Sequence, residues 1–550
     1  FVDFSWLNNI GHRHLNYYLP LYLRYVSFIK PLFITAGSFL FISLLFKNQI
    51  IALYETNVIK PELGLTIFLI VIFVILVLVA YLPFHNYPYS MDEYNYLYQA
   101  KIFSEGKLFL EVPEIYQPFK EMYMILMDNK LFSKYPPGFP LILSLGVLLN
   151  ISGVINPFIA AITLVIIFYF VRSFIRTKYA MLTVGLLATT PYFIAHSASY
   201  FAHPTALLMT SLIFLLVRRY EITPKDSCLP LVGLCSGYFF LTRPLDAFCT
   251  IVPAYLYLAY ILHKRRNLNK IIYSISTFTV VFILFLIYNY VLTGKISIAT
   301  YPIVTREFRI VDPSSAGFVS NLISISNCYI NTAVQYLPTL LVTYLLVPCA
   351  LFMPLFALFG IFKFKSKWKW VLLSNCLLLI LLYNFHPGLG WPQYGARYYY
   401  SGLFSMATLS VFAFKHVIEL LKNKEVIFQL FVLVFCTHLV FSVTAIWQYS
   451  YRFKIQLAVR EDIIKNCPPK SILLLNPGAC NRSNSTYLRI AGPFVPLVDA
   501  KRNPFMETSR LIDVNDERSH KPILRIDEIR SHFPDHSVCY YNYDILKTSE

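Results

Sequence analysis

Charged residues are scarce in this chain of 550 residues: Asp, Glu, Lys and Arg together make up only 14%, whereas 57% of the residues are hydrophobic. A soluble domain carries about 25% charged residues, so soluble domains of this total length would lack the polar side chains that cover their surfaces. The mean hydropathy of +0.56 also excludes an intrinsically disordered chain, which needs low hydrophobicity. The composition therefore predicts a polytopic membrane protein.

Motifs of nucleotide- and metal-dependent proteins are also missing. The sequence has no Walker loop, no GxGxxG at a strand-to-helix turn and no repeat with a period of about 20–50 residues. Its ten cysteines do not show the Cys/His spacing of a structural zinc site or a disulfide framework. An ATP-driven pump is therefore not expected.

What the sequence has instead is a series of long apolar stretches. A membrane-spanning helix needs roughly 20 mostly apolar residues, and the clearest one, 63–84, contains no charge. Similar stretches lie near 154–173, 179–198, 203–217, 228–242, 246–262, 271–292, 337–362, 370–385, 399–414 and 427–447. With a less certain span at 31–46, the fold class expected is an α-helical polytopic membrane protein of about 11–12 transmembrane helices.

The basic residues follow a regular pattern along these spans. Lys and Arg number 47 against 29 Asp and Glu, a net charge of +18. The basic clusters fall in every second loop, at 172–178, 218–225, 264–270, 363–369 and 415–424. This is the positive-inside pattern, whereas a nucleic-acid site would need basic residues gathered on a soluble domain. Membrane lipids, and no nucleic acid, are the partners that the pattern indicates.

The loops between the basic clusters are then predicted to lie outside the cytoplasm. These loops are 85–153, about 293–336, about 386–398 and the tail from 448. Within the first of them, 139–150 is too short to span and is expected to form an interfacial helix. The domains expected are an N-terminal segment (1–62), a transmembrane catalytic region (63–447) and a small extracytoplasmic α/β domain (448–550), which has strand-like runs at 471–475 and 494–498.

Two adjacent acids, Asp92 and Glu93, follow the clearest span. One interpretation is a solvated helix N-cap, because an amphipathic stretch begins here. The other is a general base that takes a proton from an acceptor, with its neighbour orienting it or holding a metal. Both interpretations can hold, because a carboxylate at a helix N-terminus is fixed in space.

Basic residues occur at three places where the positive-inside rule does not expect them. Lys134 precedes two prolines, which hold the chain extended; it is either a snorkelling lysine or an ammonium for a lipid-linked phosphate. Arg243 lies between two apolar stretches and could simply pair with Asp246. Arg397 begins a span, where it opposes the helix dipole, a cost that an anionic ligand would offset.

Together these features resemble the GT-C membrane glycosyltransferases that use polyprenyl-phosphate sugars, the group of the protein O-mannosyltransferases and the lipid A aminoarabinose transferase. The resemblance covers most of 63–415. It rests on Asp92-Glu93-Tyr94, Lys134-Tyr-Pro-Pro-Gly, Thr242-Arg243-Pro244, Asn289-Tyr-Val-Leu-Thr-Gly294 and Gly395-Ala-Arg397-Tyr-Tyr, in that order along the chain.

The resemblance implies a role for each of these residues. It makes Asp92 the catalytic base that activates the acceptor, with Glu93 beside it, and it places Lys134, Arg397 and more weakly Arg243 on the donor phosphate. The candidates for the substrate pocket are Tyr94, Tyr135, His203 and Tyr398. Members of the group differ in metal use, so the resemblance fixes no cofactor, and a divalent metal at the two acids stays open.

The activity implied is transfer of a hexosyl or pentosyl unit from a polyprenyl-phosphate-linked sugar to a hydroxyl or amine of a lipid, glycan or protein, with inversion. The resemblance further implies a bacterial inner membrane, with the site facing the periplasm. Two alternatives are a transporter or flippase for a lipid-linked sugar, which would show polar residues near the bilayer midplane, and a membrane oligosaccharide ligase or polymerase. A sensor with an outer domain would need fewer spans.

Overall fold

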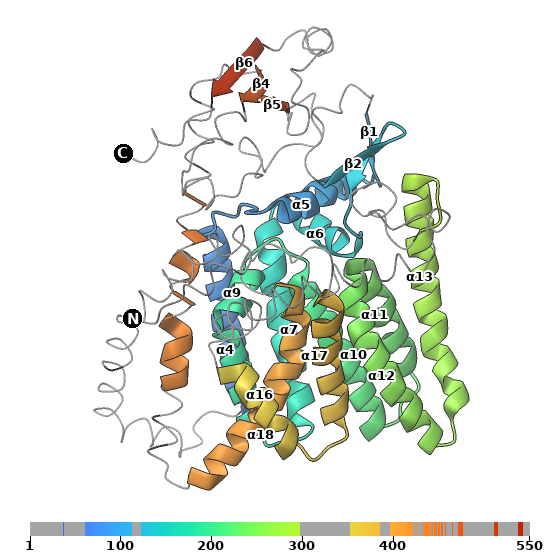
Figure 1. Ribbon diagram of the computed structural model, residues 1–550, viewed down its shortest axis with the longest axis vertical. Coiled ribbons are helices and arrows are strands. Elements are labelled where there is room, and N and C mark those ends of the chain that lie inside the picture. Colours follow the sequence, from blue (N-terminus) through green and yellow to red (C-terminus); the bar gives the residue numbers. More distant parts are fainter. Residues whose placement is uncertain are drawn as a thin grey trace, which may run out of the picture.

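The computed structural model describes residues 61–112, 123–297, 352–384 and 397–421, individual positions between 426 and 465, and three strands beyond them. These residues form a bundle of helices with two shorter helices and a small sheet at one end (Figure 1). Apart from Gly37, the uncertain span at 31–46 lies outside the described residues, as do most of the outer loops at 293–336 and 386–398 and most of the span at 337–362.

The helices of the bundle correspond to the apolar stretches of the sequence. They are α4 (Pro61–Tyr81), α7 (Ile155–Arg172), α8 (Thr177–Ala188), α9 (Pro191–Ser197), α10 (His203–Ile222), α11 (Cys228–Thr242), α12 (Pro244–Lys264), α13 (Ile271–Thr293), α16 (Phe352–Lys363), α17 (Trp368–Asn384) and α18 (Leu403–Leu421). Among the described residues, five stretches are long and apolar enough to cross a membrane: Glu62–Tyr81, Ser152–Arg172, Pro244–Lys264, Leu268–Thr293 and Arg397–Leu421. The α-helical polytopic membrane architecture is thus confirmed, while the count of 11–12 spans stays a prediction.

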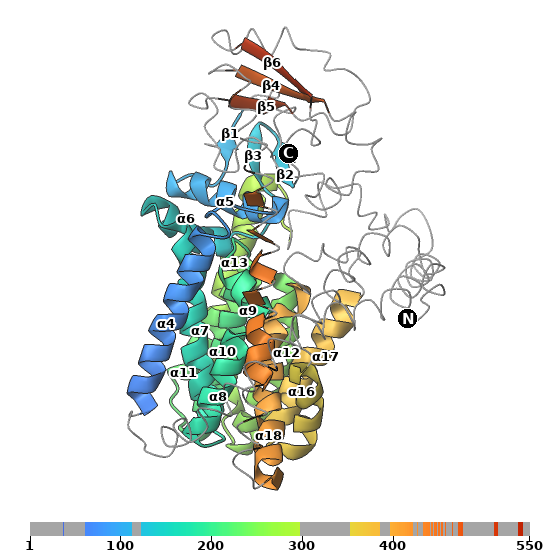
Figure 2. The same cartoon turned by 90° about the vertical axis from the view of Figure 1, so that its left-hand side faces the viewer.

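Two helices lie at the edge of the bundle and expose apolar surface. Only 11% of the apolar window of α13 and 28% of that of α4 is buried. Figure 1 shows α13 at the right-hand edge, and Figure 2 shows α4 at the left-hand edge. Large side chains such as Ile70 and Val280 are more than half exposed, which suits contact with lipid chains and would be unfavourable over so wide a surface in water.

The interior of the bundle is joined by a cluster of neutral polar side chains on four helices. The hydroxyls of Thr210 (α10) and Thr250 (α12) lie 3.1 Å apart. The Asn375 side chain on α17 donates to the Thr250 hydroxyl at 3.1 Å, and Ser405 on α18 donates to Asn375 at 2.8 Å. These groups hydrogen-bond one another, so they connect the helices at about 0.6 kcal/mol per bond in a membrane interior.

The first outer loop lies across one end of the bundle. It contains α5 (Met91–Ser104), α6 (Gly138–Leu148) and an antiparallel sheet of β1 (Leu110–Glu111), β3 (Lys130–Ser133) and β2 (Met124–Met127), in that order. At 1.5 Å per residue, the 11 residues of α6 reach about 16 Å, too short for a hydrocarbon core of about 30 Å. Its length and its place beside α5 at the end of the bundle (Figures 1 and 2) agree with the interfacial helix expected at 139–150.

The sheet is fastened to the end of α13. Asp128 and Asn129 connect β2 and β3 with positive φ values of 49° and 60°, as a two-residue hairpin requires. The ammonium of Lys130 donates to the Val291 carbonyl at 2.8 Å. α13 then ends at Gly294, whose φ of +68° is the left-handed conformation that terminates helices. The Asn289-to-Gly294 motif therefore ends a helix and supports the sheet.

The opposite end of the bundle carries the basic clusters. Arg218, near the end of α10, donates to the Ser173 hydroxyl at 3.1 Å and to Glu221 at 2.7 Å. Glu221 also accepts from the Tyr257 hydroxyl and the Trp368 indole, both at 2.7 Å. The separation of the basic residues from α5 and α6 fits the alternating loops of the sequence; the compartment that each end faces stays a prediction.

Beyond the bundle, a parallel sheet is formed by β4 (Ser471–Asn476), β5 (Leu511–Val514) and β6 (Ser537–Asn542), in the order β5-β4-β6. β4 corresponds to the strand expected at 471–475. The run at 494–498 lies outside the described residues, and the domain boundaries stay predictions.

Close packing of α11 against α13 predicts a sensitive glycine. A Cβ at Gly233 would overlap the Ser274 carbonyl and the Thr277 hydroxyl of α13. We expect Gly233→Ala to lower the free energy of unfolding by about 1–3 kcal/mol, as overpacking does. The measurement is the thermal unfolding midpoint of the detergent-solubilised protein.

The matched control is Gly185→Ala on α8, where a Cβ meets nothing within 4 Å. This change should be neutral or stabilising by about 0.5–1 kcal/mol, because alanine favours a helix over glycine. Equal midpoints for the two variants would contradict the close approach of α11 and α13.

Candidate functional site

Asp92 lies in the first turn of α5, at the end of the bundle opposite the basic clusters. The helix begins there because the Ser90 hydroxyl accepts the Glu93 backbone N–H at 3.3 Å, so Ser90 is the N-cap. The Asp92 carboxylate accepts a hydrogen bond from the Tyr135 hydroxyl and forms an ion pair with Nη1 of Arg397. The helix start considered from the sequence is confirmed, with Ser90 as its N-cap, but the Asp92 carboxylate is mostly buried and ion-paired rather than solvated.

Arg397 comes from a part of the chain 305 residues away from Asp92. It begins the short 3-10 helix η6 (Arg397–Gly402), which leads into α18. Its guanidinium carbon lies 5.1 Å from the Phe201 ring centroid and 5.4 Å from that of Tyr398. Asp92 supplies the negative charge that offsets an arginine at a helix start.

The second arginine, Arg243, also has a carboxylate partner. Its Nε lies 2.7 Å from Oδ2 of Asp246, the pair considered from the sequence, and its Nη2 donates to the Tyr383 hydroxyl at 2.9 Å. Asp246 is fully buried and also accepts from Tyr383 and, at 2.7 Å, from Ser401. This network joins the start of α12 to the end of α17 and to η6.

Tyr398 connects the two arginines. Its ring stacks on Tyr383 with a centroid distance of 4.6 Å and an interplanar angle of 10°. The guanidinium of Arg243 lies 5.9 Å from the Tyr398 ring and that of Arg397 lies 5.4 Å from it. Two arginines, two aspartates and Tyr398 therefore form one cluster at the ends of α5, α12, α17 and α18.

Lys134 lies beside Tyr135. Its ammonium is 3.2 Å from the Tyr123 ring centroid and 5.0 Å from that of Tyr135, the tyrosine that donates to Asp92. The Tyr135 ring also packs against the Tyr96 ring, at a centroid distance of 4.7 Å and tilted by 36°. The structure thus brings Lys134, Tyr135, Asp92, Arg397 and Tyr398 into one neighbourhood.

Glu93 points away from this neighbourhood. It is fully buried and accepts the Tyr200 backbone N–H at 3.1 Å and the Ser90 hydroxyl at 3.2 Å. Burial raises the pKa of Glu93 to about 8, and the hydrogen bonds from Tyr200 and Ser90 oppose that rise. The carboxyl is therefore mostly protonated at neutral pH and positions the chain around Tyr200.

The two adjacent acids do not fit a shared metal site in this arrangement. Asp92 faces an arginine, and the neutral carboxyl of Glu93 is held by a backbone amide on another side. In the part of the chain that the structure describes, no three His, Cys, Asp or Glu side chains cluster in a way that could hold a metal ion.

The turn before α10 presents two more side chains near the site. Asn156 holds this turn by donating to the carbonyls of Ser199 and Phe201 at 2.6 and 2.9 Å. Phe201 then packs on the guanidinium of Arg397. His203 is buried behind it, with its ring 5.1 Å from Phe201 and 4.9 Å from His196.

The remaining candidate, Tyr94, packs along α5 against Tyr98 at 5.7 Å. Three residues that contact the cluster or Tyr135 are not among the sequence predictions: Tyr383, Tyr96 and Ser401. For Tyr96 the sequence contains a signal, because it follows Asp92 by four residues and so lies on the same face of α5. Tyr383 and Ser401 lie in an apolar and a tyrosine-rich stretch respectively, where no pattern distinguishes them.

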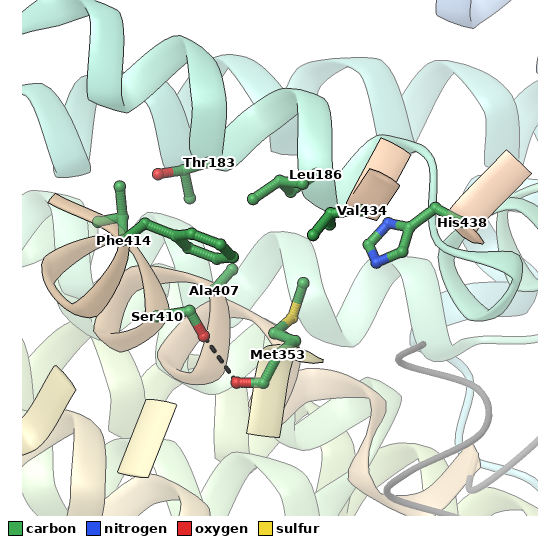
Figure 3. Close-up of a pocket in the computed structure, with 9 residues that line it drawn as sticks. Thr183, Leu186, Met353, Ala407, Ser410, Phe414, Val434 and His438 are labelled. Atoms are coloured by element: carbon green, nitrogen blue, oxygen red, sulfur yellow. Dashed lines mark hydrogen bonds between the residues drawn. The ribbon is translucent and has the colours of Figure 1, made fainter. Parts of the chain in front are cut away.

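A separate cavity lies within the bundle, away from this cluster. Figure 3 shows it between Thr183 and Leu186 of α8, Met353 of α16, Ser410 of α18 and His438. Its volume is about 10 Å³, room for about one water molecule. None of the candidate site residues lines it.

Comparison with known proteins gives two independent matches. Residues 134–289 match the family model described as dolichyl-phosphate-mannose-protein mannosyltransferase. This segment begins at Lys134 and includes His203 and Arg243, whereas Asp92 and Arg397 lie outside it. No curated protein matches the chain by sequence.

The fold is similar to that of ArnT from Cupriavidus metallidurans. With its undecaprenyl phosphate-bound crystal structure the TM-score is 0.53 at 11% identity, over 87% of this chain and 90% of ArnT. With the apo state the TM-score is 0.50 at 11% identity, over 82% and 90%. The oligosaccharyltransferase AglB from Archaeoglobus fulgidus gives 0.44 at 13% identity, over 78% and 64%. The matches to the family model and to ArnT confirm the resemblance to GT-C glycosyltransferases, and the chain has their fold.

The raised pKa of Glu93 predicts how stability depends on pH. The pKa rises from 4.5 to about 8 on folding, so the folded state holds this proton more tightly than the unfolded chain. The stability from neutral Glu93 is complete below pH 4.5, decreases as the pH rises, and is lost above about 8. Glu93→Gln, which stays neutral, should flatten this decrease in the thermal unfolding midpoint.

Glu105→Gln is the control, because Glu105 is an exposed acid at the other end of the same helix. It should keep the pH dependence of the wild-type protein. If Glu93→Gln also keeps that dependence, Glu93 is charged in the folded protein and the assignment is wrong.

Proposed function

We propose that this chain is a membrane glycosyltransferase that moves a hexosyl or pentosyl unit from a polyprenyl-phosphate carrier to a hydroxyl or amine of a lipid, glycan or protein. The observation that carries the proposal is the contact of Asp92 with Arg397 and Tyr135, beside Lys134, in a protein with the fold of ArnT. An acid and two cations at one end of a membrane bundle suit an acceptor and a phosphate that meet at the membrane surface.

Asp92 is the proposed general base. It takes the proton of the acceptor group while that group attacks the anomeric carbon of the sugar. The bond from that carbon to the phosphate oxygen breaks, and its electron pair leaves with the phosphate. A single displacement of this kind inverts the anomeric centre, through an oxocarbenium-like transition state.

Arg397 and Lys134 are the proposed ligands of the phosphate. A guanidinium matches phosphate oxygens with two parallel hydrogen bonds, and a lysine adds a point charge. These cations stabilise the charge that grows on the phosphate as the sugar leaves. Arg243 is already neutralised by the fully buried Asp246, so its proposed role is to hold Tyr398 and η6 in place.

The charges balance through the reaction. Before transfer, the two cations Lys134 and Arg397 face the Asp92 carboxylate and a phosphodiester, each with a single negative charge. After transfer, Asp92 is protonated and the phosphate carries about two negative charges. The total charge of the site is therefore unchanged, because the proton stays on Asp92 while the negative charge moves to the phosphate.

The surroundings suit a lipid carrier. The apolar surfaces of α4 and α13 are mostly exposed, and the cluster of charged residues lies at the helix ends, where a polyprenyl chain could lie in the membrane with its phosphate at the surface. We place this end on the extracytoplasmic side from the basic loops, in a bacterial inner membrane as the resemblance implies. A transporter or flippase is less well supported, because the polar groups inside the bundle hydrogen-bond one another.

The function is tested by comparing cells with and without the gene. Mass spectrometry of their envelope lipids, glycans and proteins should show the loss of a single sugar mass from one class of acceptor. The missing mass would identify the sugar, and the lipid, glycan or protein that lacks this mass would be the acceptor.

Complementation with variants then tests the site. Wild type and Glu105→Gln should restore the modification, whereas Asp92→Asn should leave it at background with a normal amount of inserted protein, since removing a catalytic base costs about 10²–10⁴-fold in rate. Full restoration by Asp92→Asn would rule out Asp92 as the base.

A further inference from the structure

The two acids of the charged cluster are held very differently, although each neutralises one arginine. Asp246 is fully buried and accepts from Arg243, Tyr383 and Ser401. Removing Arg243 from it would leave a charge uncompensated inside the protein. This pair is therefore a permanent part of the fold.

Asp92 is bound more loosely. Its side chain is 12% exposed and that of Arg397 is 9% exposed, compared with 1% for Asp246. Among the described residues its donors are Arg397 and Tyr135. If the arginine turns to another anion, Tyr135 still holds the carboxylate at the site, and the exposed part of Asp92 can be solvated.

The proposed function gives Arg397 a second anionic partner. The carboxylate of Asp92 and a phosphodiester each present two charged oxygens that match the same guanidinium donors. As long as Asp92 accepts from both Arg397 and Tyr135, each of its two oxygens is occupied by a donor, and an acceptor hydroxyl must compete with these donors for the carboxylate.

We propose that the donor phosphate displaces Asp92 from Arg397, and that Asp92 becomes a competent base only through this exchange. Arg397 then binds the phosphate, and Asp92 stays on the Tyr135 hydroxyl with one side open to the acceptor. This inference rests on the proposed function and adds an order to it: the lipid donor binds before the acceptor is deprotonated. Without the donor, the ion pair keeps the base inactive.

The site has the charge for such an exchange. In the free protein, Asp92 neutralises Arg397, and the Lys134 ammonium lies over Tyr123 beside Tyr135. A phosphodiester brings one negative charge, which Lys134 can neutralise once Arg397 is shared. The two cations Arg397 and Lys134 therefore match the two negative charges of the incoming phosphodiester and the displaced Asp92 carboxylate.

A double-mutant cycle on lipid binding tests the exchange. The full-length protein in lipid nanodiscs is titrated with undecaprenyl phosphate, and the dissociation constant is measured for wild type, Asp92→Asn, Arg397→Gln and the double variant. Because Asp92→Asn removes the competitor for Arg397, we expect it to tighten binding about tenfold in the Arg397 protein and less than about twofold in Arg397→Gln. Glu105→Gln, which removes an exposed acid from the same helix, should bind like wild type.

Three outcomes would overturn the exchange. Equal tightening in both backgrounds would mean that Asp92 only repels the phosphate through space. Weaker binding by Asp92→Asn would mean that the ion pair orients Arg397 for the lipid, and unchanged binding would mean that Asp92 and the phosphate do not compete. If wild type itself does not bind undecaprenyl phosphate, the proposed function fails instead, which separates the two failures.

Size-exclusion profiles of all four proteins identify any variant that has not folded. If Arg397→Gln does not fold, Arg397→Lys replaces it. Asp92→Asn should then tighten binding less in the Arg397→Lys background than in the Arg397 protein.

Discussion

The ion pair between Asp92 and Arg397 is the contact on which the account of this protein depends. It joins the first outer helix, α5, to the start of α18 across 305 residues of sequence, and it places two opposite charges at one end of a membrane bundle. Charges are costly near a membrane unless they are paired. Ser90 and Glu93 fix the start of α5 on one side, and Phe201 and Tyr398 pack on the guanidinium on the other.

Neighbouring residues of the same type acquire different properties from their surroundings. Asp92 and Glu93 are adjacent in the sequence, yet Asp92 faces an arginine, whereas Glu93 is fully buried and accepts from a backbone amide. Burial raises the pKa of Glu93 to about 8, although the hydrogen bond from that amide opposes the rise. Likewise the partner of Arg243, Asp246, is fully buried and accepts from three groups, whereas the partner of Arg397, Asp92, is partly exposed. The local environment therefore separates residues that position the site from those proposed to act on a substrate.

The helical membrane architecture could be predicted from the sequence because twenty-residue apolar stretches leave few alternatives. The short helix α6 followed from the length of its apolar stretch, and a helix start near Asp92 and Glu93 followed from the amphipathic stretch that begins there. The pairing of Asp92 with Arg397 did not, since no local pattern brings together residues so far apart. Tyr383 was missed for the same reason: in the sequence it is one more aromatic residue near the end of an apolar span, and only the packing of α17 beside α12 gives its hydroxyl a role. The direction in which Glu93 points also depends on a tertiary contact, with Tyr200.

The central claim is that the Asp92–Arg397 pair marks the place where a lipid-linked phosphate binds. The most direct measurement is an experimental structure of the full chain with undecaprenyl phosphate in a nanodisc. The account predicts phosphate oxygens within hydrogen-bond distance of Arg397 and near Lys134, with Asp92 still on Tyr135 but separated from the guanidinium. A phosphate bound elsewhere on the protein, or an Asp92–Arg397 ion pair that persists with the lipid bound at this site, would contradict it.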